Sequence, residues 1–127
     1  MSAAQPSSRR SAKAAPRVGA VDPVEGEIFR FATTSVVDEI EVNLTRTAYS
    51  ELIYEYKDYC VGIVTADFQL LTQSVGSMPI FLGDLGPQVR DAVEVLGVGN
   101  LEEGDVFIHN WSGVNGQHLN HIACIAP

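Results

Sequence analysis

The stretch that decides the fold is YCVGIVTADFQLLTQ, which runs from Tyr59 to Gln73. Its first half is an apolar run with several β-branched residues, and its second half is a shorter run of the same kind. Residues 66–68, between them, have the composition of a tight turn. Short apolar runs on either side of a turn are typical of two paired strands. We therefore predict strands over residues 59–64 and 69–73.

A long helix is predicted on the N-terminal side of this hairpin, from about Pro23 to Tyr49. Asp22 can cap the helix, Pro23 suits its first turn, and Glu25 stands three residues after the cap, as a capping box requires. Apolar side chains then recur at helical spacing, which predicts one apolar face. That face comprises Phe29, Val36, Val37, Ile40, Leu44 and Ala48, and Glu39 and Glu41 are expected elsewhere.

The C-terminal side of the hairpin predicts a second helix and two more strands. The segment PQVRDAVEVL, residues 87–96, has apolar residues at helical spacing, with Pro87 in its first turn and Gly97 as its stop. The segments DVFIHN at 105–110 and HIACIA at 121–126 are expected to be strands on either side of a loop rich in Asn, Ser and Gly.

These elements define an α+β fold, with a long N-terminal helix, a mostly antiparallel sheet and a second helix. The last strand stops at Pro127 without further elements to cover the sheet, and two helices on so few strands leave one sheet face exposed. We therefore expect an incomplete domain over residues 21–127.

The N-terminal segment differs in composition from the rest of the chain. Residues 1–18 hold four basic residues and no acidic one, and they are rich in Ser, Ala and Pro. Residues 1–20 are therefore expected to form a disordered basic tail. A targeting peptide is the alternative, because transit peptides are also basic and free of acids.

The remainder of the chain carries four basic residues against sixteen acidic ones, a net charge of −12. Such a surface repels phosphate backbones, so we expect no nucleic-acid partner. No apolar run approaches the about 20 residues of a membrane span, so no membrane association is expected either. Cys60 and Cys124 both have apolar neighbours. They are expected to be buried reduced thiols in a cytoplasmic protein, with a disulfide as the alternative.

All three histidines lie in one segment, GDVFIHNWSGVNGQHLNH, from Gly104 to His121. Its H-x-x-H pair, His118 and His121, would share one face of a helix but would point to opposite sides of a strand. The pair can therefore reach one metal ion only if His118 belongs to the loop, or if the strand begins with a bulge. In the alternative, one histidine is hydrogen-bonded at a loop end and the other is exposed.

Two further residues are candidates for function. Asp58 stands at the mouth of an apolar strand, where a carboxylate is either a solvated strand end or a ligand for a hard cation. His109 lies on the expected third strand, on the face opposite to Ile108 and Asn110, and is either an ordinary sheet residue or a functional one. The sequence contains no nucleophile elbow, phosphate-binding loop or Cys-x-x-Cys motif.

Four segments occur in an order that resembles a known family. They are DPVEGEIF, LTRTAYSELIYEYKDYCVGIVTADFQLLTQ, MPIFLGDLGPQV and LEEGDVFIHNWSGVNGQHLNH. Together they resemble the N-terminal part of the hydantoinase B/oxoprolinase family, over residues 21–127. The most specific pieces are R-T-A-Y-S, the K-D-Y start of the first strand, G-D-V-F, and the loop that ends in G-x-H-L. Members of the family are much longer, so the resemblance implies an N-terminal fragment.

The resemblance implies an activity and a partner. Such subunits work beside an ATP-binding subunit of the hydantoinase A type, and the two together open cyclic amides. In the related acetone and acetophenone carboxylases, they carboxylate ketones instead. The expected assembly is a hetero-oligomer in which the partner, and not this chain, binds ATP.

The resemblance also implies a divalent metal ion, which would be Zn, Mn or Mg. Asp58 in KDYC and His118 in GQHL match the ligands of the family. His121 stands where relatives commonly have Asp, in an H-L-P-D pattern, and an imidazole there shifts the preference from Mn or Mg toward Zn or removes that ligand. Further ligands would come from beyond residue 127.

Two departures from the family pattern leave alternatives open. Relatives commonly show N-D-P-Y where this chain has residues 110–113, and H-I-P-V-H where it has residues 77–81. These changes favour a divergent branch, so a subunit of a ketone carboxylase is the second hypothesis. A catalytically silent fragment, or an interaction module for a partner subunit, is the third.

Overall fold

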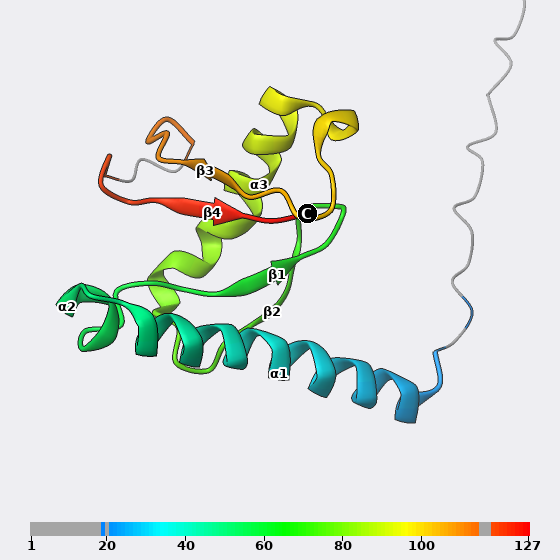
Figure 1. Ribbon diagram of the computed structural model, residues 1–127. Helices are drawn as coiled ribbons and strands as arrows, with labels where there is room; N and C mark the ends of the chain where they lie inside the picture. Colours follow the sequence, from blue (N-terminus) through cyan, green and yellow to red (C-terminus); the bar gives the residue numbers. More distant parts are fainter. Residues whose placement is uncertain (1–18, 20, 115–117) are drawn as a thin grey trace, which may run out of the picture.

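The computed structural model describes residues 19, 21–114 and 118–127. The predicted α+β class is confirmed, with a long first helix and a second main helix (Figure 1). The predicted tail, residues 1–20, lies almost wholly outside the described residues. In chain order the elements are α1 (Pro23–Thr47), α2 (Glu51–Tyr54), β1 (Gly62–Val64), β2 (Leu70–Gln73), η1 (Pro79–Phe81), α3 (Leu82–Leu96), η2 (Val98–Asn100), β3 (Phe107–His109) and β4 (Ala123–Ile125).

Helix α1 begins where the sequence predicted. The Asp22 side chain accepts hydrogen bonds from the backbone N–H groups of Val24, at 2.7 Å, and Glu25, at 3.4 Å. These bonds satisfy two of the N–H groups that a helix leaves without an intrahelical partner. At the other end, Ala48 adopts extended backbone and its N–H still donates to the Leu44 carbonyl, so the regular helix stops at Thr47.

The buried face of α1 differs from the predicted apolar face. Only Val37 and Glu41 of this helix are buried, although Glu41 was expected elsewhere. They lie one turn apart, and β2 packs against this side of the helix. Most of the predicted face is exposed, including Phe29, Val36 and Ile40. The prediction was wrong here because helical spacing identifies an apolar face but not whether another part of the chain covers it.

The predicted first hairpin is present but shorter than expected. β1 and β2 pair antiparallel, with Ile63 opposite Thr72, and a bulge shifts the register between Ile63 and Val64. In the turn, the Phe68 N–H donates to the Thr65 carbonyl at 2.9 Å, and Phe68 itself has a positive φ of 64°. The paired part of the first strand covers only residues 62–64, because Tyr59 and Val61 bond instead to the segment that follows β2.

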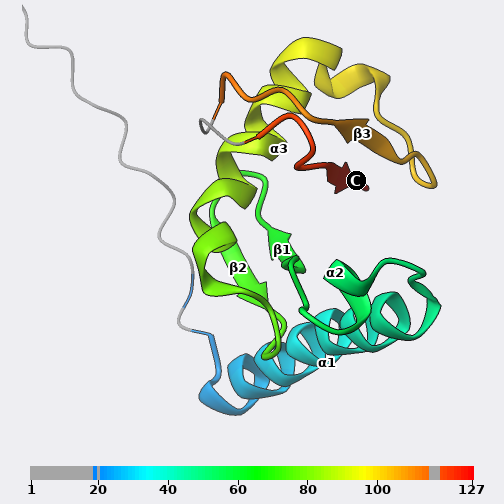
Figure 2. The same ribbon diagram turned by 90° about the vertical axis from the view of Figure 1, so that its left-hand side faces the viewer.

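The β1–β2 hairpin lies between the two main helices. α1 runs along one side of it, and α3 packs on the other side (Figures 1 and 2). The core at these contacts is small. Among the described residues, its buried apolar side chains are Val37 from α1, Tyr59 from the segment before β1, and Ala92 from α3.

Helix α3 starts five residues earlier than predicted, at Leu82, so Pro87 lies inside the helix rather than in its first turn. Proline at that point removes one backbone N–H from the helical ladder. The preceding Gly86 is buried against the turn of the first hairpin, where a Cβ atom would overlap the Phe68 carbonyl oxygen. Gly97 ends the helix as predicted, with a positive φ of 80°.

The last two strands form a second ribbon. β3 and β4 pair antiparallel, with Phe107 opposite Ile125 and His109 opposite Ala123. The expectation of one sheet is corrected here, because the described strands form two separate two-stranded sheets. The β3–β4 ribbon lies beside the C-terminal half of α3, away from α1 (Figure 2).

Both cysteines are free thiols, so the disulfide alternative is not realised. Cys60 is half-buried, but Cys124 is exposed on β4, contrary to the expectation of two buried thiols. Among the helices in the described part of the chain, none is long and apolar enough to cross a membrane.

Candidate functional site

Asp58 lies in the connection between α2 and β1, at an exposed position. Its backbone N–H donates to the Leu52 carbonyl at 2.8 Å, and the preceding Lys57 has a positive φ of 52°. These features turn the chain sharply before β1. The Asp58 carboxylate makes no hydrogen bond or ion pair with any residue in the described ranges, so it is free to accept a ligand.

The turn before Asp58 is held by a buried carboxylate of α1. Glu41 accepts hydrogen bonds from the Lys57 ammonium, at 3.2 Å, and from the Gly76 backbone N–H, at 2.9 Å. Burial on its own raises the pKa of Glu41, but hydrogen bonds from Ser74, Lys57 and Gly76 and the Lys57 charge outweigh it, so the pKa is lowered from its ordinary value of 4.5. Glu41 therefore stays ionised and joins α1 to two loops.

Residues 74–78 connect these loops to the start of β1. Ser77 Oγ accepts a hydrogen bond from the Val61 N–H at 2.8 Å and contacts the Ser74 hydroxyl. The Met78 N–H donates to the Tyr59 carbonyl at 3.0 Å. In addition, Asp38 of α1 accepts a hydrogen bond from the Val75 N–H at 3.0 Å. The backbone directly after Asp58 is therefore fixed by several buried or half-buried bonds.

His118 and His121 lie in the turn that precedes β4. The His121 N–H donates to the His118 carbonyl at 2.9 Å. The two residues therefore lie in a turn and not in one continuous strand, and a shared metal site requires that they do not lie in one strand. The His118 side chain is exposed. The His121 ring instead packs edge-on against Phe81, with 4.6 Å between the ring centroids. Asn110 closes the loop by donating to the Leu119 carbonyl at 2.6 Å.

The three predicted metal ligands have suitable donor chemistry, but they do not form a complete site in this structure. Within the described ranges, no group of three or more His, Cys, Asp or Glu side chains could hold a metal ion. Asp58 and His118 are both exposed, and the His121 ring packs against the Phe81 ring. The metal-ligand assignment of Asp58, His118 and His121 therefore stays a prediction.

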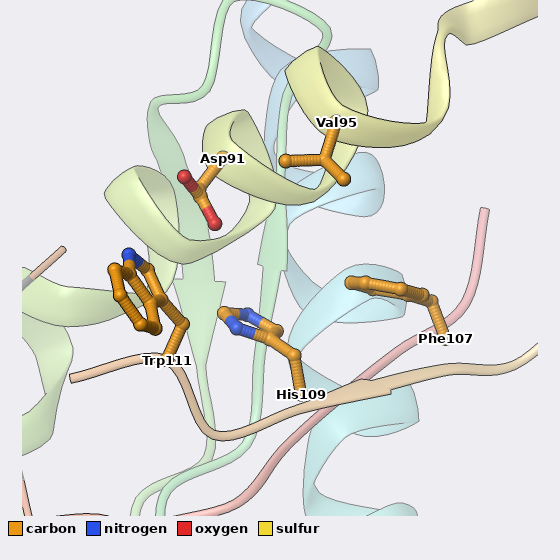
Figure 3. A pocket seen from close by; sticks show the side chains of 5 residues that line it. All are labelled: Asp91, Val95, Phe107, His109 and Trp111. Atoms are coloured by element: carbon orange, nitrogen blue, oxygen red, sulfur yellow. The ribbon is translucent and has the colours of Figure 1, made fainter. Parts of the chain in front are cut away.

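A different set of side chains surrounds a hollow between α3 and the β3–β4 ribbon (Figure 3). We call it the His109 pocket. Its volume is about 350 Å³, and it is lined by Asp91, Val95, Phe107, His109 and Trp111. Both ring nitrogens of His109 are buried and have no hydrogen-bond partner among the described residues. Figure 3 shows the Asp91 carboxylate reaching from α3 toward the side of the ribbon that carries His109.

The sequence indicated only part of this pocket. Alternation along the third strand predicted that His109 and Ile108 face opposite ways, and Ile108 is indeed exposed while His109 is half-buried. The same alternation places Phe107 beside His109, and their rings stack with 5.5 Å between centroids. Asp91 and Trp111 could not be assigned to the pocket, because no local pattern encodes how α3 packs on the ribbon.

The comparison with protein families defines the class of this protein. Residues 22–127 match the model of the family described as hydantoinase B/oxoprolinase. The match covers almost all of the chain outside the basic tail, and it agrees with the family resemblance of the sequence motifs. The chain belongs to the hydantoinase B/oxoprolinase family.

Three relatives show how similar the chain is to individual members. It is 31% identical over 106 residues to 5-oxoprolinase 1 of Arabidopsis thaliana, covering 84% of this chain and 8% of the relative. It is 28% identical over 109 residues to an uncharacterized protein of Methanocaldococcus jannaschii, covering 84% of this chain and 19% of the relative. It is 27% identical over 92 residues to a proposed B-type subunit of a D-/L-hydantoinase from a Pseudomonas species, covering 71% of this chain and 16% of that protein.

The chain therefore spans less than a fifth of the length of these curated relatives. No solved structure matches it significantly.

Proposed function

We propose that this chain contributes metal ligands to an ATP-dependent enzyme of the hydantoinase/oxoprolinase type, which opens cyclic amides by hydrolysing a C–N bond. In this proposal, an ATP-binding subunit of the hydantoinase A type works beside it, and the 127-residue chain is inactive alone. The observation that carries the proposal is the family match over residues 22–127, together with relatives named as a 5-oxoprolinase and as a B-type hydantoinase subunit.

The residues proposed to bind the ion are Asp58, His118 and His121. Asp58 and His118 support the proposal because both side chains are exposed and make no ion pair with a described residue. A carboxylate and imidazoles suit Zn, Mn or Mg to different degrees. Since the described residues form no three-ligand group, we propose that they supply part of the coordination shell.

The role of each residue follows from its surroundings. The Glu41–Lys57 pair and the short bonds around Ser77 hold the backbone next to Asp58, so the carboxylate would be presented from a fixed position. His121 must leave Phe81, or bind through the ring edge that Phe81 leaves open. A bound divalent ion would polarise the amide carbonyl and lower the pKa of a bound water toward about 7.

The proposed assembly with a partner is supported by the exposed apolar side chains. On α1 alone, large apolar residues such as Phe29, Phe31 and Ile40 are between 47% and 59% exposed. Apolar patches of that kind, rimmed by polar residues, mark protein–protein contacts. We propose that α1 meets other parts of a hetero-oligomer. We also propose a cytoplasmic location, which the two free thiols support.

A turnover assay tests the proposal. The enzyme that contains this sequence, combined with its A-type subunit, should hydrolyse ATP only when a cyclic amide such as 5-oxoproline or hydantoin is present. Asp58→Asn and His118→Ala should each reduce turnover at least a hundredfold, whereas Asp67→Asn, an exposed carboxylate in the hairpin turn, should leave it within twofold. Full turnover in both ligand variants would remove these residues from the mechanism.

Ketone carboxylation is the second candidate function. Ser77 and Phe81 stand where relatives have the two histidines of the H-I-P-V-H pattern. Ser77 bonds to backbone and Phe81 packs on His121, so neither offers a metal ligand. This loss favours a chemistry that differs from hydantoin hydrolysis. ATP consumption that requires both bicarbonate and a ketone would assign this chemistry. ATP consumption with a cyclic amide and without bicarbonate would rule it out.

A further inference from the structure

We propose that the basic N-terminal segment of this chain, residues 1–18, lies across the His109 pocket and the hollow next to it. This second hollow, of about 150 Å³, shares Phe107 with the His109 pocket. Its lining residues are Leu96, Asn100, Leu101, Asp105, Val106 and Phe107. The two hollows together form a groove between the C-terminal half of α3 and the β3 segment, which we call the Phe107 groove. The inference does not depend on metal binding, because none of the proposed metal ligands lines either hollow.

The wall of the groove suits apolar contact. The His109 pocket is almost wholly apolar and open to solvent, so a chain segment can lie across it without being enclosed. Two of its lining side chains, Val95 and Trp111, are largely exposed, at 72% and 66%. Arg and Lys cover such surfaces with their alkyl stems while their charged ends stay in water, and the Arg guanidinium also stacks on aromatic faces.

The charges around the groove favour a basic occupant. Residues 91–127 contain five acidic residues and no Lys or Arg, and two of these acids, Asp91 and Asp105, line the groove. By contrast, residues 21–90 carry four Lys or Arg residues, and Arg30 and Lys57 already form ion pairs there. The side of the molecule around the groove is therefore uniformly acidic, and such a field attracts cations.

Residues 1–18 have the composition that this groove favours. They contain four basic residues, two prolines and no acidic residue. Proline-rich segments are recognised in aromatic-lined grooves, where proline rings and alkyl stems pack on the aromatic rings.

The segment is also long enough to reach the groove from the start of α1. Eighteen residues span up to about 60 Å when extended, which exceeds the about 30 Å diameter of a small domain. Because the segment is covalently attached, its effective concentration at the groove is on the order of millimolar. Even a weak contact is therefore populated within one chain.

A thiol-labelling experiment tests the contact in the enzyme that contains this sequence. Val95→Cys places a thiol in the groove, whereas Val98→Cys places one at a position that is equally exposed, at 72%, and lines neither hollow. Mass spectrometry of the corresponding peptides gives the rate of maleimide labelling at each position. The thiol at position 95 should react about fivefold more slowly when residues 1–18 are present than after their removal. The thiol at position 98 should react equally fast in both forms.

The role of charge is tested by replacing Arg9, Arg10, Lys13 and Arg17 together by Gln, which keeps the length and the prolines of the segment. This variant should lose the protection at position 95. The original enzyme should lose it in about 0.5 M NaCl, because the Debye length falls to about 4 Å. A synthetic peptide of residues 5–18, added to the enzyme without residues 1–18, should restore the protection. The same peptide with Gln at the four basic positions should not.

Four results would overturn the proposal. The first is labelling at position 95 that is equally fast with and without residues 1–18. The second is labelling at position 95 that is slow in both forms, which would show that another part of the enzyme covers the groove. The third is equal protection of positions 95 and 98 by the segment. The fourth is protection that disappears on dilution of the enzyme, which would assign the contact to the segment of a second copy and not of the same chain.

Discussion

Glu41 joins helix α1 to the two loops that surround the candidate site. It is 7% exposed and charged, and such a group is tolerated only when its oxygens are fully hydrogen-bonded. Its partners come from the turn before Asp58 and from the loop after β2. The geometry near Asp58 therefore depends on a residue that the helical pattern assigned to the wrong face.

We predict that Glu41→Gln lowers the free energy of unfolding by about 1–3 kcal/mol at pH 7, because the Lys57 charge and the Gly76 N–H lose a charged acceptor. Urea unfolding measures this difference. Glu39→Gln is the matched control, since Glu39 is exposed on the same helix, and it should change stability by less than about 0.5 kcal/mol. Equal effects of the two substitutions would refute the role of Glu41.

The same residue predicts a dependence of stability on pH. The pKa of Glu41 is lower in the folded chain than its ordinary value of 4.5. Its ionisation thus adds stability above pH 4.5, and that contribution disappears as the pH falls from 4.5 through the folded pKa. Unfolding measured between pH 7 and pH 3 should show a smaller loss in Glu41→Gln than in the original chain. An unchanged pH profile would contradict the assignment.

The two thiols are predicted to differ in reactivity. Burial, with a smaller effect of the Asp84 charge, raises the pKa of Cys60 to about 11, whereas Cys124 is exposed. The thiolate is the reactive form, so a disulfide-exchange reagent at pH 8 should label Cys124 at least tenfold faster than Cys60. Mass spectrometry of the partly labelled chain identifies the site. Preferential labelling of Cys60 would contradict the burial of its thiol.

At the scale of the elements, the sequence correctly predicted the features that depend on a few neighbouring residues. The Asp22 cap, the helix stop at Gly97 and the two hairpins were all predictable, because caps, stops and turns depend on a few neighbouring residues. The start of α3 was predicted too late, since Pro87 suggested a first turn and not an interior position. Which face of α1 is buried and how the two ribbons separate depend on packing between distant segments, and no local pattern encodes that packing.

The contact between α3 and the first hairpin gives a sharp test at this scale. Gly86→Ala should lower the free energy of unfolding by about 1–3 kcal/mol, because the added Cβ would overlap the Phe68 carbonyl oxygen. Gly83→Ala is the control in the same helix, where nothing lies within 4 Å of an added Cβ. It should leave stability unchanged or raise it by up to about 1 kcal/mol. Tolerance of both substitutions would show that α3 does not pack against the hairpin turn at Gly86.

At the scale of the whole molecule, the chain combines a small core with many exposed apolar side chains. The chain spans less than a fifth of the length of its relatives, and much of the α1 surface is exposed. Both facts agree with the proposal that the chain works inside a larger assembly. The candidate ligands could be named from the family motif but not confirmed by geometry, because two of them are free at the surface and His121 contacts Phe81. Sequence similarity names candidate residues, whereas their arrangement in space depends on packing that no short motif encodes.

We propose above all that Asp58, His118 and His121 contribute ligands to one divalent ion. The most direct test is a calorimetric titration with Zn²⁺, and with Mn²⁺ in parallel, of the enzyme that contains this sequence, assembled with its A-type subunit. We predict saturable binding of one ion per chain, weakened at least tenfold by each of Asp58→Asn, His118→Ala and His121→Ala, and unchanged in Asp67→Asn. Absence of saturable binding, or binding that is equally tight in all four variants, would contradict the account.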